Sequence, residues 1–207
     1  MNFAASDQQT LLNIMRWRRD VRHFKTEAVP DHLLKELQHA IQLSPSVGNS
    51  RPWRIFAVKS QQIRAQIYDN FQQANAEAAT IYDERRSIQY AQLKLEAIQT
   101  APIQLAVFTE TNPDQGHGLG RQTIKDTLIQ STAMAIQNLN LVARSLGLGV
   151  GMVSILNPHA IEQLFKVPES WQFSFYLCIG WPAFDSDQPL LHQLGWQEND
   201  DENWIEI

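Results

Sequence analysis

Short apolar runs separated by much longer helical stretches constrain the fold more than any other feature of this sequence. Four runs have the length and composition of buried strands, at residues 55–58, 103–108, 150–155 and 173–179. Helical spacing of apolar residues is found up to about residue 18, from residue 31 to a loop at 44–49, and in residues 61–99, 131–146 and 158–165. This alternation favours an α+β fold with a central mixed β-sheet flanked by helices, and not an all-β barrel.

Local signals mark where several of these helices begin. Ser6, with Gln9 three residues later, can form a capping box for the first helix. Asn157 followed by Pro158 is a good N-cap and first-turn pair. The chain has 207 residues, 43% of them hydrophobic, which is ample for one core. We therefore expect a single domain over residues 1–207.

Charge and composition argue against several classes of protein. The formal net charge is -5, whereas a duplex-binding surface needs many Lys and Arg, so no nucleic-acid partner is expected. The N-terminus lacks the pattern of an export signal, and no stretch approaches the ~20 apolar residues that span a bilayer, so we expect a cytoplasmic protein without membrane association. Cys178 lies in an apolar run that predicts a buried strand thiol, and the six His are scattered, so no metal site is expected.

Three arginines surround one carboxylate at the end of the first helix. Arg18, Arg19 and Arg22 flank Asp20. Guanidinium groups suit bidentate recognition of phosphate, so this is the best candidate anion site in the chain. The alternative interpretation is a solvated basic patch with Asp20 as its counterion.

The loop at residues 44–53 combines a glycine, short polar side chains and a tryptophan just before a strand. Such a loop can approach a planar heterocycle through its main chain, but it can equally be an ordinary connection with Trp53 in the core. The glycines at 147, 149 and 151 follow a helix and precede a strand. Because a dinucleotide-binding fingerprint needs the reverse order, we reject a Rossmann interpretation.

Taken together, these segments resemble the nitroreductase superfamily, whose members carry an arginine-rich element after the first helix, a Pro-Trp loop and a Gly-Leu-Gly turn into a central strand. The resemblance covers residues 18–182. More narrowly, the sequence is similar to the 5,6-dimethylbenzimidazole synthase family. The segments that carry this similarity are Arg-Arg-Asp-Val-Arg (18–22), Pro-Ser-Val-Gly-Asn-Ser-Arg-Pro-Trp (45–53), Leu-Lys-Leu-Glu (93–96), Leu-Gly-Arg (119–121), Gln-Asn-Leu (137–139) and Gly-Leu-Gly-Val-Gly-Met-Val-Ser-Ile (147–155).

The resemblance implies an FMN-binding, intertwined homodimer of the nitroreductase fold, with two flavin sites at the interface, each built from both chains. Arg18, Arg19 and Arg22 would hold the FMN phosphate and the adjacent polar edge. Asp20 matches the family's catalytic carboxylate, and Ser154 would act near the reactive N5 edge of the flavin. The other residues implied in FMN binding are Val21, Pro45, Ser46, Gly48, Arg121, Gly151 and Val153.

The implied reaction consumes the flavin. Reduced FMN, supplied by a separate flavin reductase, would be the substrate, and O2 would fragment it to 5,6-dimethylbenzimidazole, the lower ligand of vitamin B12, and erythrose 4-phosphate. In this reaction Asp20 would move protons and Ser154 would hydrogen-bond to the reacting edge. The protein would also shield the reacting flavin from water.

Other functions remain open at the level of sequence. One is an NAD(P)H-dependent FMN reductase of nitro compounds, quinones or corrinoids, in which the flavin is recycled. Another is a flavin-binding protein without turnover, and a third is a plain α+β scaffold.

Three further segments bear on the site. Residues 111–120 and 82–90 are candidates for a lid over it. Family members often carry basic residues after a Gly-Trp pair near the C-terminus, whereas here Gly195-Trp196 is followed by the acidic segment 197–201. Binding of the FMN phosphate would therefore depend more heavily on the arginines at 18–22, or on another basic group such as Arg121.

Overall fold

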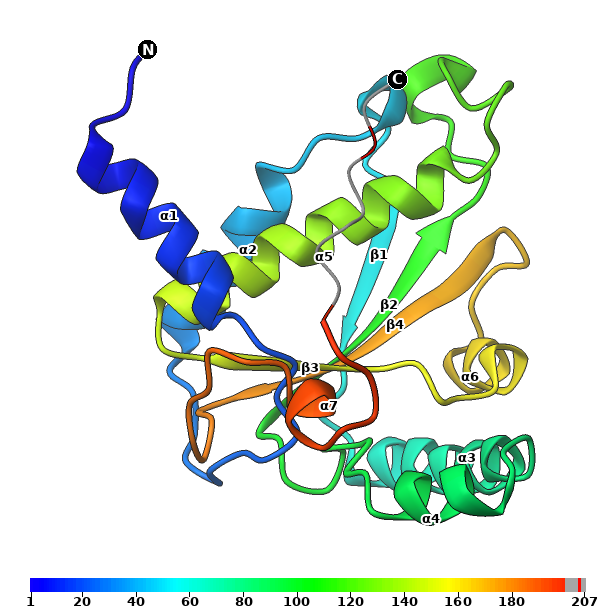
Figure 1. Ribbon diagram of the computed structural model, residues 1–207. Coiled ribbons are helices and arrows are strands. Elements are labelled where there is room, and N and C mark those ends of the chain that lie inside the picture. The colour runs from blue at the N-terminus through cyan, green and yellow to red at the C-terminus, as the bar shows by residue number, and fades with distance from the viewer. Residues whose placement is uncertain (200–204, 206–207) are drawn as a thin grey trace.

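Residues 1–199 and 205 are described in the computed structural model, and within them a four-stranded sheet in the order β1-β2-β4-β3 lies at the centre (Figure 1). The strands are β1 (Trp53–Ala57), β2 (Ile103–Glu110), β3 (Gly149–Val153) and β4 (Trp171–Gly180). All three strand pairs are antiparallel. The expected mixed character is confined to one parallel bridge at the sheet edge, between Asp20 and Val150.

Helices cover both faces of the sheet (Figure 1). Two of them, α2 (Asp31–Gln42) and α5 (Thr127–Ser145), bury Leu37, Ile136 and Leu139 in an apolar cluster on one face. On the other face, α3 (Gln61–Ala79) and α6 (Pro158–Phe165) bury Ile67, Phe71 and Ile161. Because β2 and β4 are covered on both faces, their sequences read as nearly continuous apolar runs.

The predicted helical stretch at 61–99 is interrupted. The first part, α3, ends at Ala79, and α4 (Glu84–Ala91) begins after Asp83, whose carboxylate accepts a hydrogen bond from the Arg86 N–H at 2.8 Å. This N-cap starts a new helix at a point where the spacing of apolar residues gives no sign of a break. The chain after α4 is irregular as far as β2.

The first helix, α1 (Ala5–Trp17), differs from expectation at its start and in its environment. It begins after Ala4, whose N–H donates to Asp7, so the predicted capping box of Ser6 and Gln9 is wrong. None of its residues is buried against the described parts of the chain, and Leu11, Leu12 and Met15 are each more than 40% exposed. Figure 1 shows α1 extending outward beyond α5. An apolar stripe of this kind is typical of surfaces that another molecule covers.

Cys178 lies in β4 with no exposed surface, as its apolar neighbours predict. Burial raises the pKa of the Cys178 thiol to about 12.

Among the described residues, no helix is both long enough and apolar enough to cross a membrane.

Among the described residues Tyr176 is the largest fully buried side chain, and burial raises the pKa of its hydroxyl. Its hydroxyl donates to Gln104 Oε1 at 2.6 Å. We expect Tyr176→Phe to lower the free energy of unfolding by about 1–3 kcal/mol, because the Gln104 oxygen would lose its partner in the core. Urea denaturation measures the effect. Tyr68→Phe, at a half-buried position on α3, is the control and should change stability by less than about 0.5 kcal/mol; equal effects of the two variants would contradict this account.

Candidate functional site

The segment at residues 20–22 lies along β3, an edge strand of the sheet within the described part of the chain. The Val21 N–H donates to the Val150 carbonyl at 3.0 Å. The Met152 N–H donates to Asp20 Oδ1 at 2.9 Å, and Arg22 donates from Nη2 to the Met152 carbonyl at 2.7 Å. The edge strand thus has its outward-facing backbone groups satisfied by this segment, which fixes both Asp20 and Arg22.

Glycine at position 151 makes this close approach possible. A Cβ atom there would lie 2.2 Å from the Val21 carbonyl oxygen. At Gly149 a Cβ atom would lie 2.6 Å from Val21 Cγ2. The glycines that superficially suggest a nucleotide fingerprint therefore serve to dock residues 20–22 on β3.

We expect Gly151→Ala to displace this segment. The added methyl group overlaps backbone rather than a flexible side chain, so the substitution should cost about 1–3 kcal/mol of stability. Hydrogen exchange of the Val21 and Met152 amides should accelerate, since both donate hydrogen bonds across this contact. Wild-type protection of both amides would show that the segment adapts without leaving β3.

Asp20 and Arg22 form an ion pair at this edge, with 2.6 Å between Oδ2 and Nη2. The arginine side chain is 12% exposed and that of the aspartate 43%. Arg22 Nη1 is buried and has no hydrogen-bond partner among the described residues. The pair therefore presents an accessible carboxylate beside a guanidinium with an unused donor.

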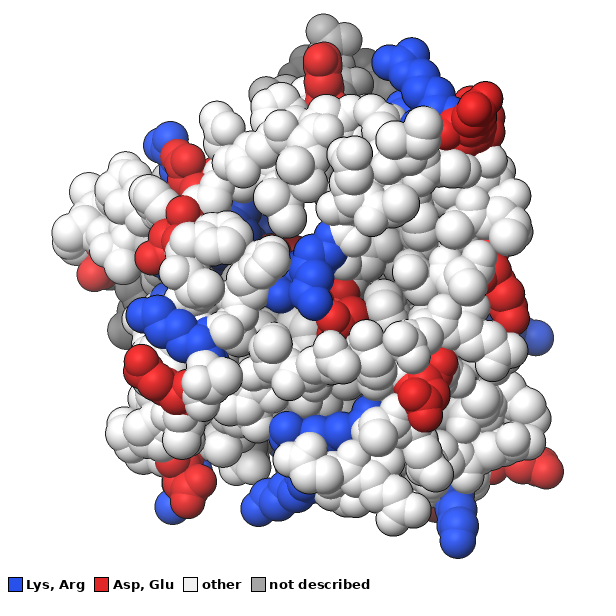
Figure 2. Space-filling view, turned by 90° about the horizontal axis from the view of Figure 1, so that it is seen from below, with Lys and Arg blue, Asp and Glu red and all other residues white. Residues whose placement is uncertain are grey.

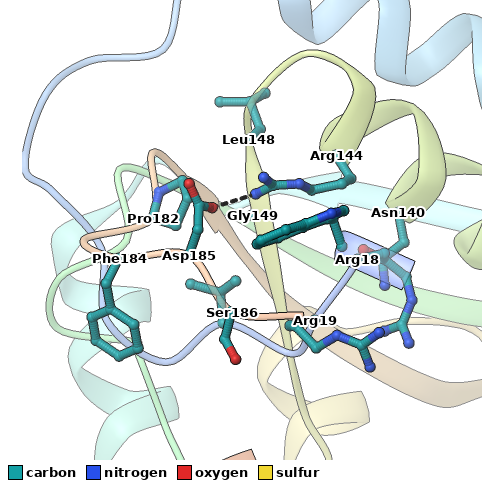
Figure 3. Close-up of a pocket in the computed structure, with 12 residues that line it drawn as sticks. Arg18, Arg19, Asn140, Arg144, Leu148, Gly149, Pro182, Phe184, Asp185 and Ser186 are labelled. Atoms are coloured by element: carbon teal, nitrogen blue, oxygen red, sulfur yellow. Dashed lines mark hydrogen bonds and ion pairs between the residues drawn. The ribbon is translucent and has the colours of Figure 1, made fainter. Parts of the chain in front are cut away.

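The other two arginines of the cluster lie close by. Arg19 donates to the Arg16 carbonyl, and burial, followed by the proximity of Arg18, lowers its pKa. Nearby carboxylates pair elsewhere: Asp185 binds Arg144 at 2.6 Å, and Asp187 binds Arg16 at 2.8 Å. Figure 3 shows the Asp185–Arg144 pair in the pocket that Arg18 and Arg19 also line. The guanidinium groups of Arg18 and Arg19 form no ion pair with either of these two carboxylates.

A cavity of about 240 Å³ opens beside this cluster. Its lining consists of Arg18, Arg19, Asp20, Arg22, Lys94, Leu95 and residues 189–191. The last of these belong to the start of a short helix, α7 (Leu190–Gln193), which sequence periodicity does not predict. Figure 2 shows basic and acidic atoms together in a hollow near the centre of the face seen from below. Opposite charges and apolar side chains thus meet in one cavity.

Val153 is the last residue of β3, and Ser154 follows it directly. The Val153 side chain is 1% exposed in the core, so only its backbone can contribute to a site. Ser154 is exposed. It lies two residues after Met152, whose N–H donates to Asp20.

The predicted loop at 45–50 is held by a different set of contacts. The Val47 N–H donates to Ser131 Oγ at 3.0 Å, and Ser46 Oγ accepts from the Arg51 N–H at 3.0 Å. Gly48, in the short 3-10 helix η1 (Val47–Asn49), has a φ of 57°. A Cβ atom there would lie 3.0 Å from the Gly116 carbonyl oxygen. These contacts hold the loop in place. Pro45 is exposed beside it, and Trp53 is half-buried at the start of β1.

Residues 116–120 pack against this loop, and Thr111 donates to the Ser170 carbonyl, so the segment does not hang free over the surface. They include a second 3-10 helix, η2 (Gln115–Gly118). At Gly120 a Cβ atom would lie 2.8 Å from Val47 Cγ2. Arg121 Nη1 is buried and has no hydrogen-bond partner among the described residues. Arg121 thus belongs with the loop and not with the arginines at 18–22.

One chain does not bring the two groups of predicted site residues together. Val47 contacts Ser131 near the start of α5, whereas Asn140 and Arg144 near its end line the pocket with Arg18 and Arg19. Ser131 and Arg144 are 13 residues apart, so at 1.5 Å per residue the two groups are about 20 Å apart along the helix. We call them the arginine half-site (residues 18–22 with 149–154) and the loop half-site (residues 45–50 with 115–121).

A family model described as the nitroreductase family matches residues 15–181. The chain belongs to the nitroreductase family. Proteins named 5,6-dimethylbenzimidazole synthase are among its relatives: one from Rhodobacter capsulatus is 48% identical over 99% of both chains, and one from Rhodospirillum rubrum is 45% identical over 94% of this chain and 92% of its own. The resemblance seen in the sequence is confirmed.

Solved structures confirm the nitroreductase fold. Iodotyrosine deiodinase bound to FMN and 3-iodo-L-tyrosine has a TM-score of 0.71 at 21% identity and covers 85% of this chain and 91% of its own. A BluB-like flavoprotein from Clostridium difficile 630 has a TM-score of 0.68 at 21% identity and covers 88% of this chain and 92% of its own.

In this nitroreductase-family chain the second predicted lid segment is tied to the C-terminal region. Arg86 of α4 donates to the Trp196 carbonyl at 3.0 Å, and its guanidinium lies 5.2 Å from the centre of the Trp196 ring. Tyr82 and Tyr90 pack on the same ring. A role as a lid stays a prediction. Of the acidic segment 197–201, residues 200 and 201 lie outside the described residues.

Lys94 is the site residue that reasoning from single motifs misses. It occurs in the Leu-Lys-Leu-Glu segment, which helped to identify the family but suggests no role by itself. Its cavity neighbours come from residues 18–22 and 189–191, more than 70 positions away in either direction. Only the tertiary structure reveals that these segments meet.

Proposed function

We propose that the chain binds reduced FMN and converts it with O2 to 5,6-dimethylbenzimidazole. The relatives of that name, similar over almost the whole chain, support this reaction. The observation that carries the proposal is the docking of Asp20 on β3, where its carboxylate faces a cavity lined by three arginines. Such a carboxylate is positioned to exchange protons with a bound anionic substrate.

The residues present suit a phosphorylated flavin. Two guanidinium nitrogens, Arg22 Nη1 and Arg121 Nη1, are buried without hydrogen-bond partners among the described residues, one in each half-site. Buried donors of this kind are normally satisfied, so a ligand that accepts hydrogen bonds fits them. In our proposal Arg18, Arg19 and Arg22 bind the phosphate and the adjacent polar edge of the flavin, and Arg121 contributes from the loop half-site.

We further propose that the functional unit is a homodimer in which the arginine half-site of one chain faces the loop half-site of the other. The separation of the two half-sites along α5 requires either this arrangement or two unrelated sites. The exposed apolar side chains of α1 supply a surface that a second copy would bury. Ser46, Gly48 and the backbone around them would then contact the flavin across the interface.

The protein's part in the chemistry follows from the contacts of Asp20. The reduced flavin supplies the electrons that O2 accepts. The Met152 N–H and Arg22 each donate to Asp20, and these two contacts fix the direction of its carboxylate. In the proposed reaction Asp20 accepts and returns protons, while the Ser154 hydroxyl hydrogen-bonds to the reacting edge. The neighbouring α7 and the partner chain would exclude water from the site.

One experiment separates this function from its alternatives. The protein is incubated with FMN, a separate flavin reductase, NADPH and air, and 5,6-dimethylbenzimidazole is sought by mass spectrometry. Loss of flavin with formation of this product supports the synthase. Oxidation of NAD(P)H by the protein alone, with nitro compounds, quinones or a corrinoid as acceptors and the flavin retained, would instead identify a reductase. Binding of flavin with neither outcome would identify a flavin-binding protein.

A further inference from the structure

We propose that Lys94 is a further substrate-binding residue of the Asp20 cavity, and that the buried carboxylate of Glu96 positions it there. Its ammonium group would pair with an anionic group of the bound reduced flavin. This inference rests on the proposed function and deepens it, because it concerns how the same site recognises the charge of its substrate.

The location of Lys94 is the first observation. It lies in the irregular segment between α4 and β2 and lines the cavity together with Arg18, Arg22 and Asp20. Its side chain is 39% exposed, although its ammonium group is paired with a buried carboxylate. A cation at this position adds to the positive charge that the arginines provide.

The second observation is how the lysine is held. Glu96 is 5% exposed, and its Oε1 accepts a hydrogen bond from Lys94 Nζ at 2.5 Å. Its Oε2 accepts from the Ile98 N–H, also at 2.5 Å. Each carboxylate oxygen therefore has one defined donor. An ammonium group has three donors, so Lys94 keeps two for a ligand.

A buried carboxylate with these two partners is well suited to orient a lysine. Burying a charge is costly unless it is paired, so Glu96 strongly favours the conformation in which Lys94 reaches it. The long lysine side chain is thereby ordered before any ligand arrives. Binding then loses less conformational entropy than it would with a free surface lysine.

The charge around the cavity indicates what Lys94 binds. Arg18, Arg19, Arg22 and Lys94 supply four cationic groups, against the two carboxylates Asp20 and Glu96. This excess of positive charge favours an anionic ligand. Reduced FMN has two sources of negative charge, its phosphate and its ring system when that is deprotonated. Lys94 can pair with either one.

The test compares four ligands with three variants. Oxidised and reduced FMN and oxidised and reduced riboflavin are titrated anaerobically against the wild type, Lys94→Met, Lys94→Arg and Lys59→Met, with binding followed by flavin fluorescence or absorbance. Lys59 is an exposed lysine whose replacement changes the net charge equally. A charge-assisted contact corresponds to roughly a tenfold change in affinity or more, so Lys94→Met should lose about that factor, and Lys59→Met should not.

The pattern across ligands identifies the paired group. Pairing with the phosphate predicts weaker binding of FMN in both redox states and unchanged binding of riboflavin. Pairing with the ring predicts weaker binding of both reduced ligands, and hence a lower reduction potential of the bound flavin. In either case Lys94→Arg should retain most of the affinity. Equal affinities of Lys94→Met and wild type for all four ligands would overturn the inference.

A double-mutant cycle tests the role of Glu96. If Glu96 acts through Lys94, Glu96→Gln should weaken flavin binding in the wild-type background and have no further effect on affinity in Lys94→Met. Additive losses would contradict a positioning role. Should Glu96→Gln not fold, the Lys94 variants still decide the main point. Failure of the wild type itself to bind any flavin would refute the proposed function, whereas flavin binding by the wild type with equal affinities in Lys94→Met would refute only the role of Lys94.

Discussion

Asp20→Asn is expected to reduce the formation of 5,6-dimethylbenzimidazole by a factor of about 10²–10⁴, the usual contribution of a group that transfers protons. Flavin binding should change far less. Asparagine can still accept the hydrogen bond from the Met152 N–H, so the segment at 20–22 should stay docked on β3. The substitution removes two properties of Asp20: its ability to take up a proton, and the negative charge that faces Arg22.

Single-turnover measurements with reduced FMN and O2 separate the two effects. Flavin affinity is measured anaerobically, and product is quantified after mixing with air. Asp69→Asn, which removes a carboxylate from an exposed position on α3, is the matched control and should behave like the wild type. If Asp20→Asn forms product at the wild-type rate, Asp20 is a structural residue and proton transfer must be assigned elsewhere. If affinity and rate fall together, its main role is to orient Arg22.

Mixing two inactive variants is expected to restore activity, because each proposed flavin site takes its half-sites from different chains. Asp20→Asn damages only the arginine half-site. Gly48→Val damages only the loop half-site, since the larger side chain would meet the Gly116 and Leu119 carbonyl oxygens at a position with positive φ. In a heterodimer, one site contains both damaged half-sites and the other contains neither.

The size of the recovery follows from random pairing of the subunits. Half of the dimers are heterodimers and each has one intact site, so about a quarter of wild-type activity should return. Co-expression with two different affinity tags allows the heterodimer to be isolated, and its activity should then approach half. A mixture of Asp20→Asn with Arg22→Ala, both in the arginine half-site, is the control and should stay inactive. Absence of recovery in the first mixture would show that the half-sites do not combine across chains.

The sequence allows the main helices and strands to be predicted because each has a strong local cause. The apolar runs of β2 and β4 are buried on both faces, and Asn157 caps α6 through the Ala160 N–H as expected. The break between α3 and α4 could not be predicted in the same way, because a polar N-cap at Asp83 is compatible with a continuing helix. Periodicity also cannot show whether the apolar stripe of α1 is covered by its own chain.

In the candidate site, too, some residues are predictable from local sequence and others only from tertiary contacts. Residues 18–22 stand out because charge of one type is concentrated within five positions, and the glycine at 48 because its loop needs a positive φ. Which of these segments are neighbours depends on contacts between distant parts of the chain. Arg121 is therefore found beside residues 45–50, away from the other arginines, and Lys94 joins residues 18–22.

The docking of residues 20–22 on β3 has a consequence for solubility. An uncovered edge strand offers unpaired backbone groups to any other strand, and proteins that leave such edges open tend to aggregate. Here the segment that carries the proposed catalytic carboxylate also shields one edge of the sheet. Substitutions that loosen it should therefore impair catalysis and promote self-association together.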